Sequence, residues 1–329
     1  MTNVIAFAIL SAIKIGIVIG VLLLVIAYLI WIERKVMAHM QVRLGPMRVG
    51  WHGLLQPIAD GLKLILKEDI IPANASKILF VLSPAIAMVP ALLAIAVIPF
   101  GDTISIMGVS IDMVITDVNI GILFILAVSS VGVYGILLAG WSSNNKYSLL
   151  GGLRSSAQMI SYELSMGLSL IGVIMMTESL SLVDTVNAQA GLWFVVLQPV
   201  AFVVYAISAI AETNRCPFDL PEAETELVSG FHTEYSSMKF ALFFMAEYAN
   251  IITVSAVGVT FFFGGWRGPF LPPVVWFLIK MAMCIFFFVW LRSTFPRFRI
   301  DQLMQFAWKI LLPVAIANVL ITGLVMSFL

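Results

Sequence analysis

Long apolar stretches separated by shorter polar segments make up most of the chain. Eight of these stretches are long enough to cross a lipid bilayer, which takes about 20 residues in helical conformation. They cover residues 4–32, 77–99, 118–140, 157–179, 192–211, 240–263, 273–291 and 306–329. None alternates with the period of a β-strand, and a helix satisfies its own backbone groups in hydrocarbon. The pattern predicts an all-α integral-membrane protein of about eight transmembrane helices, in one domain over residues 1–329.

The first long connection, residues 33–76, contains a helical pattern of a different kind. Apolar residues recur there at helical spacing, with charged residues between them. The apolar positions are Leu54, Ile58, Leu62 and Ile65, and the charged positions are Asp60, Lys63 and Lys67. This pattern is typical of an amphipathic helix that lies on the membrane surface. It fits both a simple membrane anchor and the wall of a binding site.

Basic residues outside the predicted spans are concentrated on one side of the membrane. The first, third, fifth and seventh connections, with the adjoining helix ends, hold all of them except Arg267. They are Arg34, Lys35, Arg43, Arg48, Lys63, Lys67, Lys77, Lys146, Arg154, Arg215, Lys239, Arg292, Arg297, Arg299 and Lys309. Because cytoplasmic loops carry the excess of Lys and Arg, these connections are expected on the inner side. Both ends of the chain are then expected on the outer side.

Composition supports a lipid environment and excludes several function classes. Apolar residues make up 61% of the chain and charged residues 11%, too few charges for the surface of a water-soluble globule or for a disordered chain. The net charge of +0 does not suggest nucleic-acid binding. The two cysteines, Cys216 and Cys284, are too few for an iron–sulfur cluster and lack the spacing of a metal site. Any flavin, cluster or metal is therefore expected on another chain.

Two acidic residues lie inside predicted spans. Glu163 lies in the fourth span and Glu247 in the sixth. A charged carboxylate at the centre of a bilayer costs about 2.5–3.5 kcal/mol, so it is normally paired, hydrated or protonated. Intramembrane acids of this kind often belong to proton pathways. We therefore interpret both residues as candidate members of such a pathway.

The fifth connection is unusually acidic. Its acidic residues are Glu212, Asp219, Glu222, Glu224, Glu226 and Glu234, against only Arg215 and Lys239. Crowded carboxylates tend to share protons, which makes them candidates for a proton relay. An acidic loop that docks a basic partner is the alternative. The seventh connection is short and basic, with Arg292, Arg297 and Arg299, which fits pairing with carboxylates as well as ordinary inner-side charge.

Several long strings of the chain resemble one protein family. They are ERKVMAHMQVRLGP (33–46), GLLQPIADGLKLILKE (53–68), SAQMISYE (156–163), AETNRCPFDLPEAETELVSGF (211–231), EYSSMKFALFFMAEY (234–248) and PRFRIDQLMQFAWK (296–309). On these strings the chain is similar to the H-type membrane subunits of bacterial NADH-quinone oxidoreductase, the counterparts of subunit 1 of mitochondrial respiratory complex I. One departure is Met47, where the family usually has asparagine.

The resemblance implies a membrane subunit of the proton-translocating NADH:quinone oxidoreductase. In that family, peripheral-arm subunits carry the flavin and the iron–sulfur clusters, and antiporter-like and small membrane subunits complete the membrane arm. It implies quinone as the substrate, lipid around the spans, and no nucleic-acid partner, flavin, cluster or metal for this chain. The location implied is the bacterial inner membrane, with the inner loops cytoplasmic and both termini periplasmic.

The resemblance also implies roles for individual residues. The segments that match the quinone chamber contain Arg34, Arg43, Asp60, Lys63 and Phe231. Those that match the acidic loop and the internal acidic pathway contain Glu163, Glu212, Asp219, Glu222, Glu224, Glu226, Glu234 and Glu247. Arg292, Arg297 and Arg299 match a basic loop near the mouth of the chamber.

Three alternative functions are also compatible with the residues. Intramembrane acids also occur in stand-alone proton-coupled transporters, although the long inner loops argue against one. A passive anchor for a peripheral enzyme would make the buried acids dispensable. A homologous component of a complex fed by F420H2 or ferredoxin would share most of the same strings.

Overall fold

The computed structural model describes residues 2–106, 109–219 and 228–328. Its helices of 14 or more residues are α1 (Thr2–Met40), α3 (Lys77–Ala94), α4 (Gly121–Ser142), α5 (Lys146–Thr177), α8 (Pro199–Glu212), α10 (Ser237–Phe262), α11 (Pro273–Thr294) and α13 (Leu312–Phe328). The shorter ones are α2 (Gln56–Leu66), α6 (Leu182–Ala188), α7 (Phe194–Leu197) and α12 (Ile300–Phe306). A π-helical turn, Ala307–Leu311, joins α12 to α13. Single 3₁₀ turns cover Trp51–Gly53, Ile95–Val97 and Gly230–His232.

Seven helices in the described part of the chain are long and apolar enough to cross a membrane. They confirm the predicted all-helical membrane class, and each of them overlaps one of the predicted spans. The predicted span 192–211 is instead divided into α7 and α8, and α8 has only 14 residues. The break falls at Gln198, where the following Pro199 disfavours helical backbone and cannot donate a hydrogen bond.

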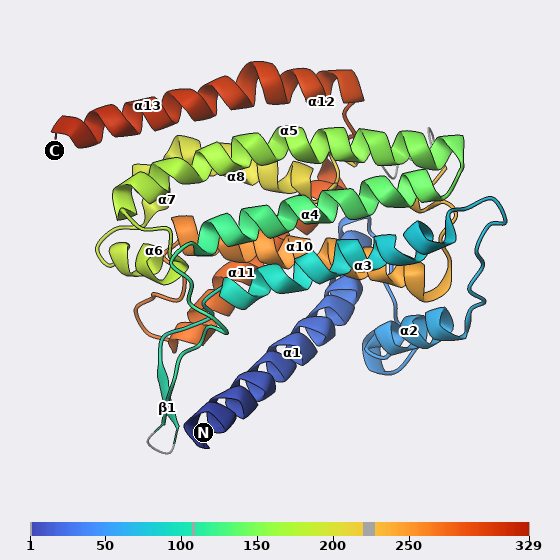
Figure 1. Cartoon of the computed structure of the whole chain (residues 1–329), viewed down its shortest axis with the longest axis horizontal. Coiled ribbons are helices and arrows are strands. Elements are labelled where there is room, and N and C mark those ends of the chain that lie inside the picture. The colour runs from blue at the N-terminus through green and yellow to red at the C-terminus, as the bar shows by residue number, and fades with distance from the viewer. Residues whose placement is uncertain (1, 107–108, 220–227, 329) are drawn as a thin grey trace.

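The helices pack side by side into one bundle (Figure 1). The main contacts join α3 to α4, α4 to α5, α5 to α8 and α3 to α10. Close approach between α3 and α4 depends on Gly135, because a Cβ atom there would lie 2.7 Å from the backbone nitrogen of Ala87. Small residues at helix contacts are typical of membrane proteins, where packing holds helices together.

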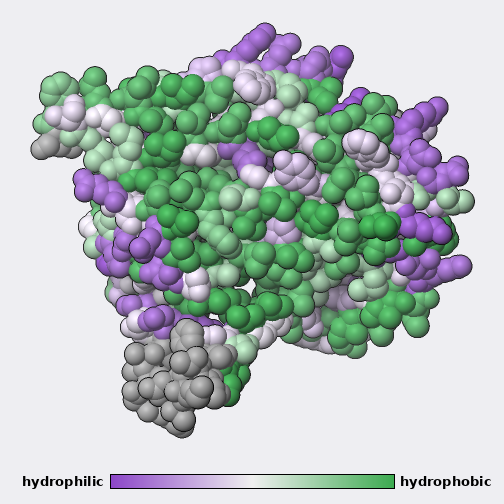
Figure 2. Space-filling model, in the orientation of Figure 1, coloured by the Kyte–Doolittle hydropathy of each residue, from purple (hydrophilic) through white to green (hydrophobic). Residues whose placement is uncertain are grey.

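The bundle has two distinct ends. At one, which we call the α2 end, α2 lies outside the bundle against α1 and α10 (Figure 1). The other, the hairpin end, carries the short antiparallel strands β1 (Ile104–Ile106) and β2 (Val109–Ile111), which the apolar pattern did not predict. Helix α1 begins and α13 ends at the hairpin end. The space-filling view shows a mostly apolar surface between more hydrophilic residues at the two ends (Figure 2).

Helix α2 confirms the amphipathic helix predicted in the first connection. Its apolar residues Ile58, Leu62 and Ile65 are all exposed on the surface of the chain. Polar contacts fix the segment to the start of α10. Ser237 donates to the carbonyl of Leu64 at 2.9 Å, and Lys239 forms an ion pair with Asp69 at 2.9 Å. An apolar face without cover, next to the ends of two spans, suits the surface of a membrane.

Candidate functional site

A buried cluster of charges lies near the α2 end of the bundle, and Arg215 is at its centre. Arg215 follows the end of α8, and its side chain is only 6% exposed. Its guanidinium contacts Glu33 of α1 at 2.9 Å and Glu247 of α10 at 2.6 Å. Arg292 of α11 also pairs with Glu33, and the Tyr248 hydroxyl donates to the other oxygen of Glu33 at 2.7 Å. We call these five residues the Arg215 cluster.

The cluster is balanced in charge, with two arginines and two glutamates. Burial lowers the pKa of Arg215, whereas Glu247, Tyr248 and Glu33 raise it, and the net effect is a pKa well above the usual value. The guanidinium also lies over the Tyr248 ring, 4.5 Å from its centroid. Arg215 therefore stays positively charged, and any change of charge in this cluster must come from the carboxylates.

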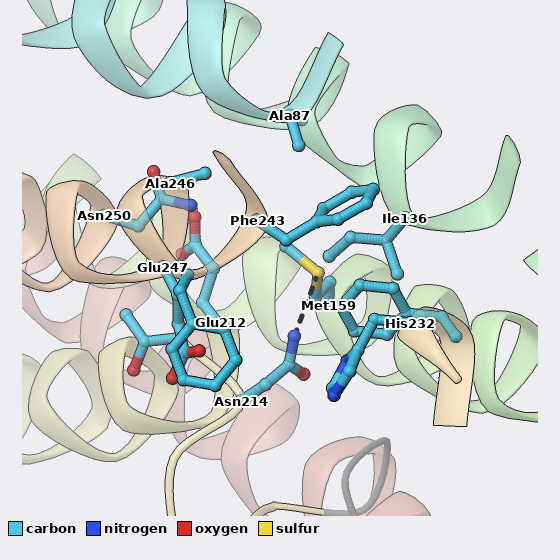
Figure 3. A pocket seen from close by; sticks show the side chains of 14 residues that line it. Ala87, Ile136, Met159, Glu212, Asn214, His232, Phe243, Ala246, Glu247 and Asn250 are labelled. Carbon is cyan, nitrogen blue, oxygen red and sulfur yellow. Dashed lines mark hydrogen bonds between the residues drawn. The ribbon is translucent and has the colours of Figure 1, made fainter. Parts of the chain in front are cut away.

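A cavity adjoins the cluster, enclosed by α3, α4, α5, α8, α10 and the turn at Gly230–His232. Glu247 lines it together with Glu212 and Asn250, and these three gather on one side (Figure 3). His232, Phe243 and Ile136 lie on the other. The cavity leaves about 40 Å³ in which the centre of a water molecule fits. One molecule needs about 10–15 Å³ on this measure, so there is room for water here.

A second cavity continues from the first toward α4 and α5. Glu212 and Asn250 line both cavities, and the second also contains Ser129, Tyr205 and Thr253. It leaves about 20 Å³ for the centres of water molecules. One carboxylate oxygen of Glu212 is buried with no hydrogen-bond partner in the described part of the chain. A buried carboxylate oxygen is normally hydrogen-bonded, so this atom is suited to a bound water molecule.

Glu163 of α5 lies beyond the second cavity. Ser129 and Ser130 of α4 both contact its carboxylate, Ser129 at 3.5 Å. Ser129 also lines the second cavity, so it lies between Glu163 and Glu212. The structure thus places Glu247, Glu212 and Glu163 in one row, joined by two cavities and a hydroxyl pair.

The other predicted acids do not all lie in this row. Glu234 accepts a hydrogen bond from Asn145 at 2.7 Å, in the connection between α4 and α5. Asp219 pairs with Arg297 at 3.1 Å. Glu222, Glu224 and Glu226 lie outside the described residues.

The residues expected at the quinone chamber lie in two different places. Phe231 is buried and lines the first cavity. Arg34 pairs with Asp60 at 2.6 Å and ties α1 to α2. Arg43 and Lys63 are exposed near the α2 end, where Arg43 donates to Gln41 at 2.8 Å. Asp60 and Lys63 thus belong to α2, Arg34 and Arg43 lie near or just after the end of α1, and none of these four lines either cavity.

The three arginines of the basic loop have different partners. Arg292 belongs to the Arg215 cluster, and Arg297 pairs with Asp219. Arg299 is exposed and lies 3.3 Å from its neighbour Asp301. The short seventh connection thus contacts both the buried cluster and the fifth connection. At Met47, where the family usually has asparagine, the sulfur accepts a hydrogen bond from Lys35 at 3.0 Å.

Sequence reasoning missed several members of the site. Asn250 could have been found, because it follows Glu247 by three residues and so shares its helix face. The adjacent Ser129 and Ser130 in an apolar span were a weaker signal. Arg215 was interpreted only as a loop charge and Glu33 was not singled out. Their pairing joins residues 182 positions apart, which no local pattern reveals.

The described residues contain no group of His, Cys, Asp and Glu side chains that could hold a metal ion. The chemistry available is that of carboxylates, hydroxyls, amides and guanidinium groups. The carboxylates and hydroxyls can accept, hold and pass protons, and the fixed charge of the guanidinium groups affects how readily the carboxylates do so.

Comparison with known proteins shows the family of the chain. The NADH dehydrogenase family profile matches residues 13–323. An H-type subunit (copy 1) of the NADH-quinone oxidoreductase of Geobacter sulfurreducens is 58% identical over 327 residues, which cover 95% of this chain and 94% of that protein. The H-type copy 2 of Geobacter metallireducens is 57% identical over 98% of this chain and 97% of that protein. The H-type copy 2 of Koribacter versatilis is 53% identical over 98% of this chain and 99% of that protein. The chain therefore belongs to the NADH dehydrogenase family, as a helical membrane subunit of the H type in an NADH-quinone oxidoreductase complex.

Proposed function

We propose that the chain forms part of a quinone chamber at its α2 end and transmits the charge change of quinone reduction through its buried carboxylates. The observation that carries this proposal is a row of polar groups across the bundle, in which ion pairs, a hydrogen bond and two cavities lie between successive members. It begins with Arg292 and Glu33, passes Arg215 and Glu247, and reaches Glu212 through the first cavity. Through the second cavity and Ser129 it ends at Glu163.

The chamber belongs at the α2 end for physical reasons. A quinone has a polar headgroup and a long apolar tail, so its site must open toward lipid while offering polar groups inside. The exposed apolar face of α2 supplies the contact with lipid, and Arg34 and Asp60 supply polar groups beside it. Phe231 belongs to the wall that the chamber shares with the first cavity.

Reduction of a quinone to a quinol consumes protons as well as electrons. The electrons come from outside this chain, whose residues hold no redox centre in our proposal. The protons and the accompanying charge change are felt first by the carboxylates closest to the headgroup. Unit charges about 4 Å apart interact by about 4 kcal/mol near a protein surface, which corresponds to about a thousandfold change in a proton equilibrium.

The Arg215 cluster passes that change inward. Glu33 and Glu247 share one guanidinium, so a change in the charge of either carboxylate alters the environment of the other. Water in the two cavities then connects Glu247 with Glu212, and Glu212 with the Ser129–Glu163 pair. Coupled carboxylates of this kind titrate as one system.

Glu163 is placed where the row can leave the chain. It is half-buried, and its neighbours Ile160 and Leu164 on α5 are exposed. We propose that another membrane subunit covers this face and continues the pathway toward the antiporter-like subunits. The α2 end, with its basic residues, is proposed to face the cytoplasm and to contact the peripheral arm that carries flavin and clusters. The membrane is then the bacterial inner membrane, with both termini periplasmic.

Isosteric substitutions in the assembled complex test this proposal. Glu212→Gln and Glu247→Gln remove the proton-carrying group without changing side-chain volume. Glu178→Gln is the matched control, because Glu178 is exposed at the hairpin end of α5. Quinone reduction by NADH and proton pumping in sealed vesicles are measured, together with reduction of a water-soluble artificial acceptor, which reports the peripheral arm alone.

The expected result is a fall of pumping and quinone reduction to below about a tenth in the first two variants, a barrier increase of at least about 1.4 kcal/mol. Reduction of the artificial acceptor and the control variant are expected to be unchanged. Normal pumping by both Glu212→Gln and Glu247→Gln would contradict the proposed pathway.

A further inference from the structure

The side chain of Lys280 occupies an unusual position at the hairpin end of the bundle. Lys280 belongs to α11, a predicted span, and it is only 7% exposed. Its ammonium group donates to three backbone carbonyls: that of Phe263 at 2.7 Å, that of Gly265 at 3.0 Å and that of Arg267 at 2.6 Å. All the N–H donors of the lysine are thus used by the turn that follows α10.

Two indole rings complete the surroundings of this ammonium group. It lies 4.6 Å from the centroid of the Trp193 ring and 6.0 Å from that of Trp276, both within the range of cation–π attraction. Glycines let the rings approach the turn. A Cβ atom at Gly264 would lie 3.0 Å from the Trp193 ring, and one at Gly268 would lie 2.4 Å from the Trp276 ring.

The backbone of the turn directs its carbonyls toward the Lys280 ammonium group. Gly264 and Gly265 both have left-handed backbone angles, with φ of +69° and +53°. Glycine adopts this conformation without the steric penalty of a side chain. The consecutive left-handed residues turn the chain so that carbonyls of residues 263, 265 and 267 meet at one point.

No carboxylate pairs with Lys280 in the described part of the chain. Its charge is balanced by the carbonyl dipoles, by the π faces of the indoles and by the negative end of the α10 helix dipole. Such surroundings select a compact cation with several N–H donors. They resemble a binding site for a free ammonium ion more than an ordinary salt bridge.

We infer that the turn after α10 is a binding site for a compact primary-ammonium cation, and that the chain fills this site with its own Lys280. The site consists of the carbonyls of Phe263, Gly265 and Arg267 and the rings of Trp193 and Trp276; we call it the carbonyl cage. Nothing in this inference depends on the proposed proton pathway.

The carbonyl cage makes Lys280 a positioning residue for α10. Gln189 holds the same turn from another side, because it accepts from the backbone of Gly264 at 2.9 Å and donates to the carbonyl of Thr260 at 2.8 Å. The cage and Gln189 together fix one end of the helix that carries Glu247 and Asn250. Loss of the ammonium group is expected to loosen this end.

Chemical rescue of Lys280 variants tests the inference. Lys280→Ala leaves the cage open, so a small amine can enter it. Lys280→Met is the matched control, because its side chain fills most of the same volume without offering N–H donors. Membranes with each variant are prepared with methylammonium, with tetramethylammonium or without added amine. The readouts are the amount of assembled complex on a native gel and the midpoint temperature at which it dissociates.

Lys280→Ala is expected to lower the midpoint by about 5 °C or to reduce the amount of complex at least about twofold. Methylammonium is expected to restore at least about half of the loss, whereas tetramethylammonium, which has no N–H donor, restores none. Lys280→Met is expected to be impaired and to respond to neither ion.

Three results would overturn the inference. One is normal assembly and stability of Lys280→Ala without any amine. Another is an impaired Lys280→Ala variant that methylammonium, present while the membranes are prepared, does not improve. The third is equal improvement of Lys280→Ala and Lys280→Met by methylammonium, which would indicate general stabilisation by the salt.

Discussion

Replacement of Arg215 by methionine should strongly destabilise the subunit. The Arg215 side chain is 6% exposed, and its guanidinium contacts two carboxylates at 2.9 Å and 2.6 Å. Methionine preserves much of the side-chain volume but leaves the cluster with one positive and two negative charges. Removal of one partner from a buried ion pair costs about 3–5 kcal/mol, because the remaining charge is not compensated in a medium of low polarity.

A second substitution should recover part of that loss. The double variant Arg215→Met/Glu247→Gln removes one charge of each sign, so the remaining pair of Arg292 and Glu33 is balanced again. We expect a coupling free energy of about 1–3 kcal/mol between the two positions, measured by a double-mutant cycle. Arg215→Lys keeps the charge but cannot present the same fork of donors to two carboxylates, so it should be intermediate.

The assay is thermal dissociation of the purified complex, followed by release of this chain on a native gel. With about 2 °C per kcal/mol, Arg215→Met should lower the midpoint by about 6–10 °C, and the double variant should be several degrees more stable than Arg215→Met alone. The reasoning is refuted if Arg215→Met is as stable as the unchanged protein. It is refuted equally if the losses from Arg215→Met and Glu247→Gln simply add in the double variant.

Three further predictions concern other described residues. Phe231→Leu removes part of the apolar cavity wall, so the KM for quinone should rise several-fold while reduction of an artificial acceptor stays constant; an unchanged KM would argue against a chamber there. Gln158 donates to the carbonyls of Ala211 and Phe218 at 2.8 and 2.7 Å, so Gln158→Leu should lower the dissociation midpoint by about 2–6 °C, whereas an unshifted midpoint would show these bonds to be dispensable. Burial and, to a smaller extent, the Asp219 carboxylate raise the pKa of the Cys216 thiol, so less thiolate is present at a given pH. Alkylation of Cys216 should therefore be slower than that of a free cysteine, become faster with rising pH and be accelerated by Asp219→Asn. Equal alkylation rates with and without Asp219→Asn would contradict the electrostatic cause.

The apolar pattern was sufficient for most of the fold. A run of about 20 apolar residues has one stable solution in lipid, which is why seven spans match helices long enough to cross. The apolar pattern failed where proline, helix capping or a short hairpin determined the structure. Pro199 divides the fifth predicted span. Helix α5 begins at Lys146, where the Asn145 side chain caps it, whereas the predicted span begins only at residue 157, because the first turns of α5 are too polar to be recognised as part of a span. The short hairpin of β1 and β2 gave no detectable signal.

The candidate site was predictable only in part. Glu163 and Glu247 were found because an acid in an apolar span is expensive unless something compensates it. Their compensating groups, Ser130 and Arg215, come from distant segments and are set by helix packing. Loop acids carry no such constraint. Glu234 and Glu212 therefore look alike in the sequence, as acids of the same polar connection. In the structure Glu234 contacts Asn145, whereas Glu212 lines two cavities.

The central claim is that quinone reduction changes the protonation of buried carboxylates in this chain. Infrared difference spectroscopy of the complex, recorded before and after quinone reduction, measures such changes directly. The account predicts a carboxylic acid C=O band in the difference spectrum that shifts in heavy water and is lost in Glu212→Gln but retained in Glu178→Gln. A spectrum that is the same in both variants and in the unchanged complex would contradict it.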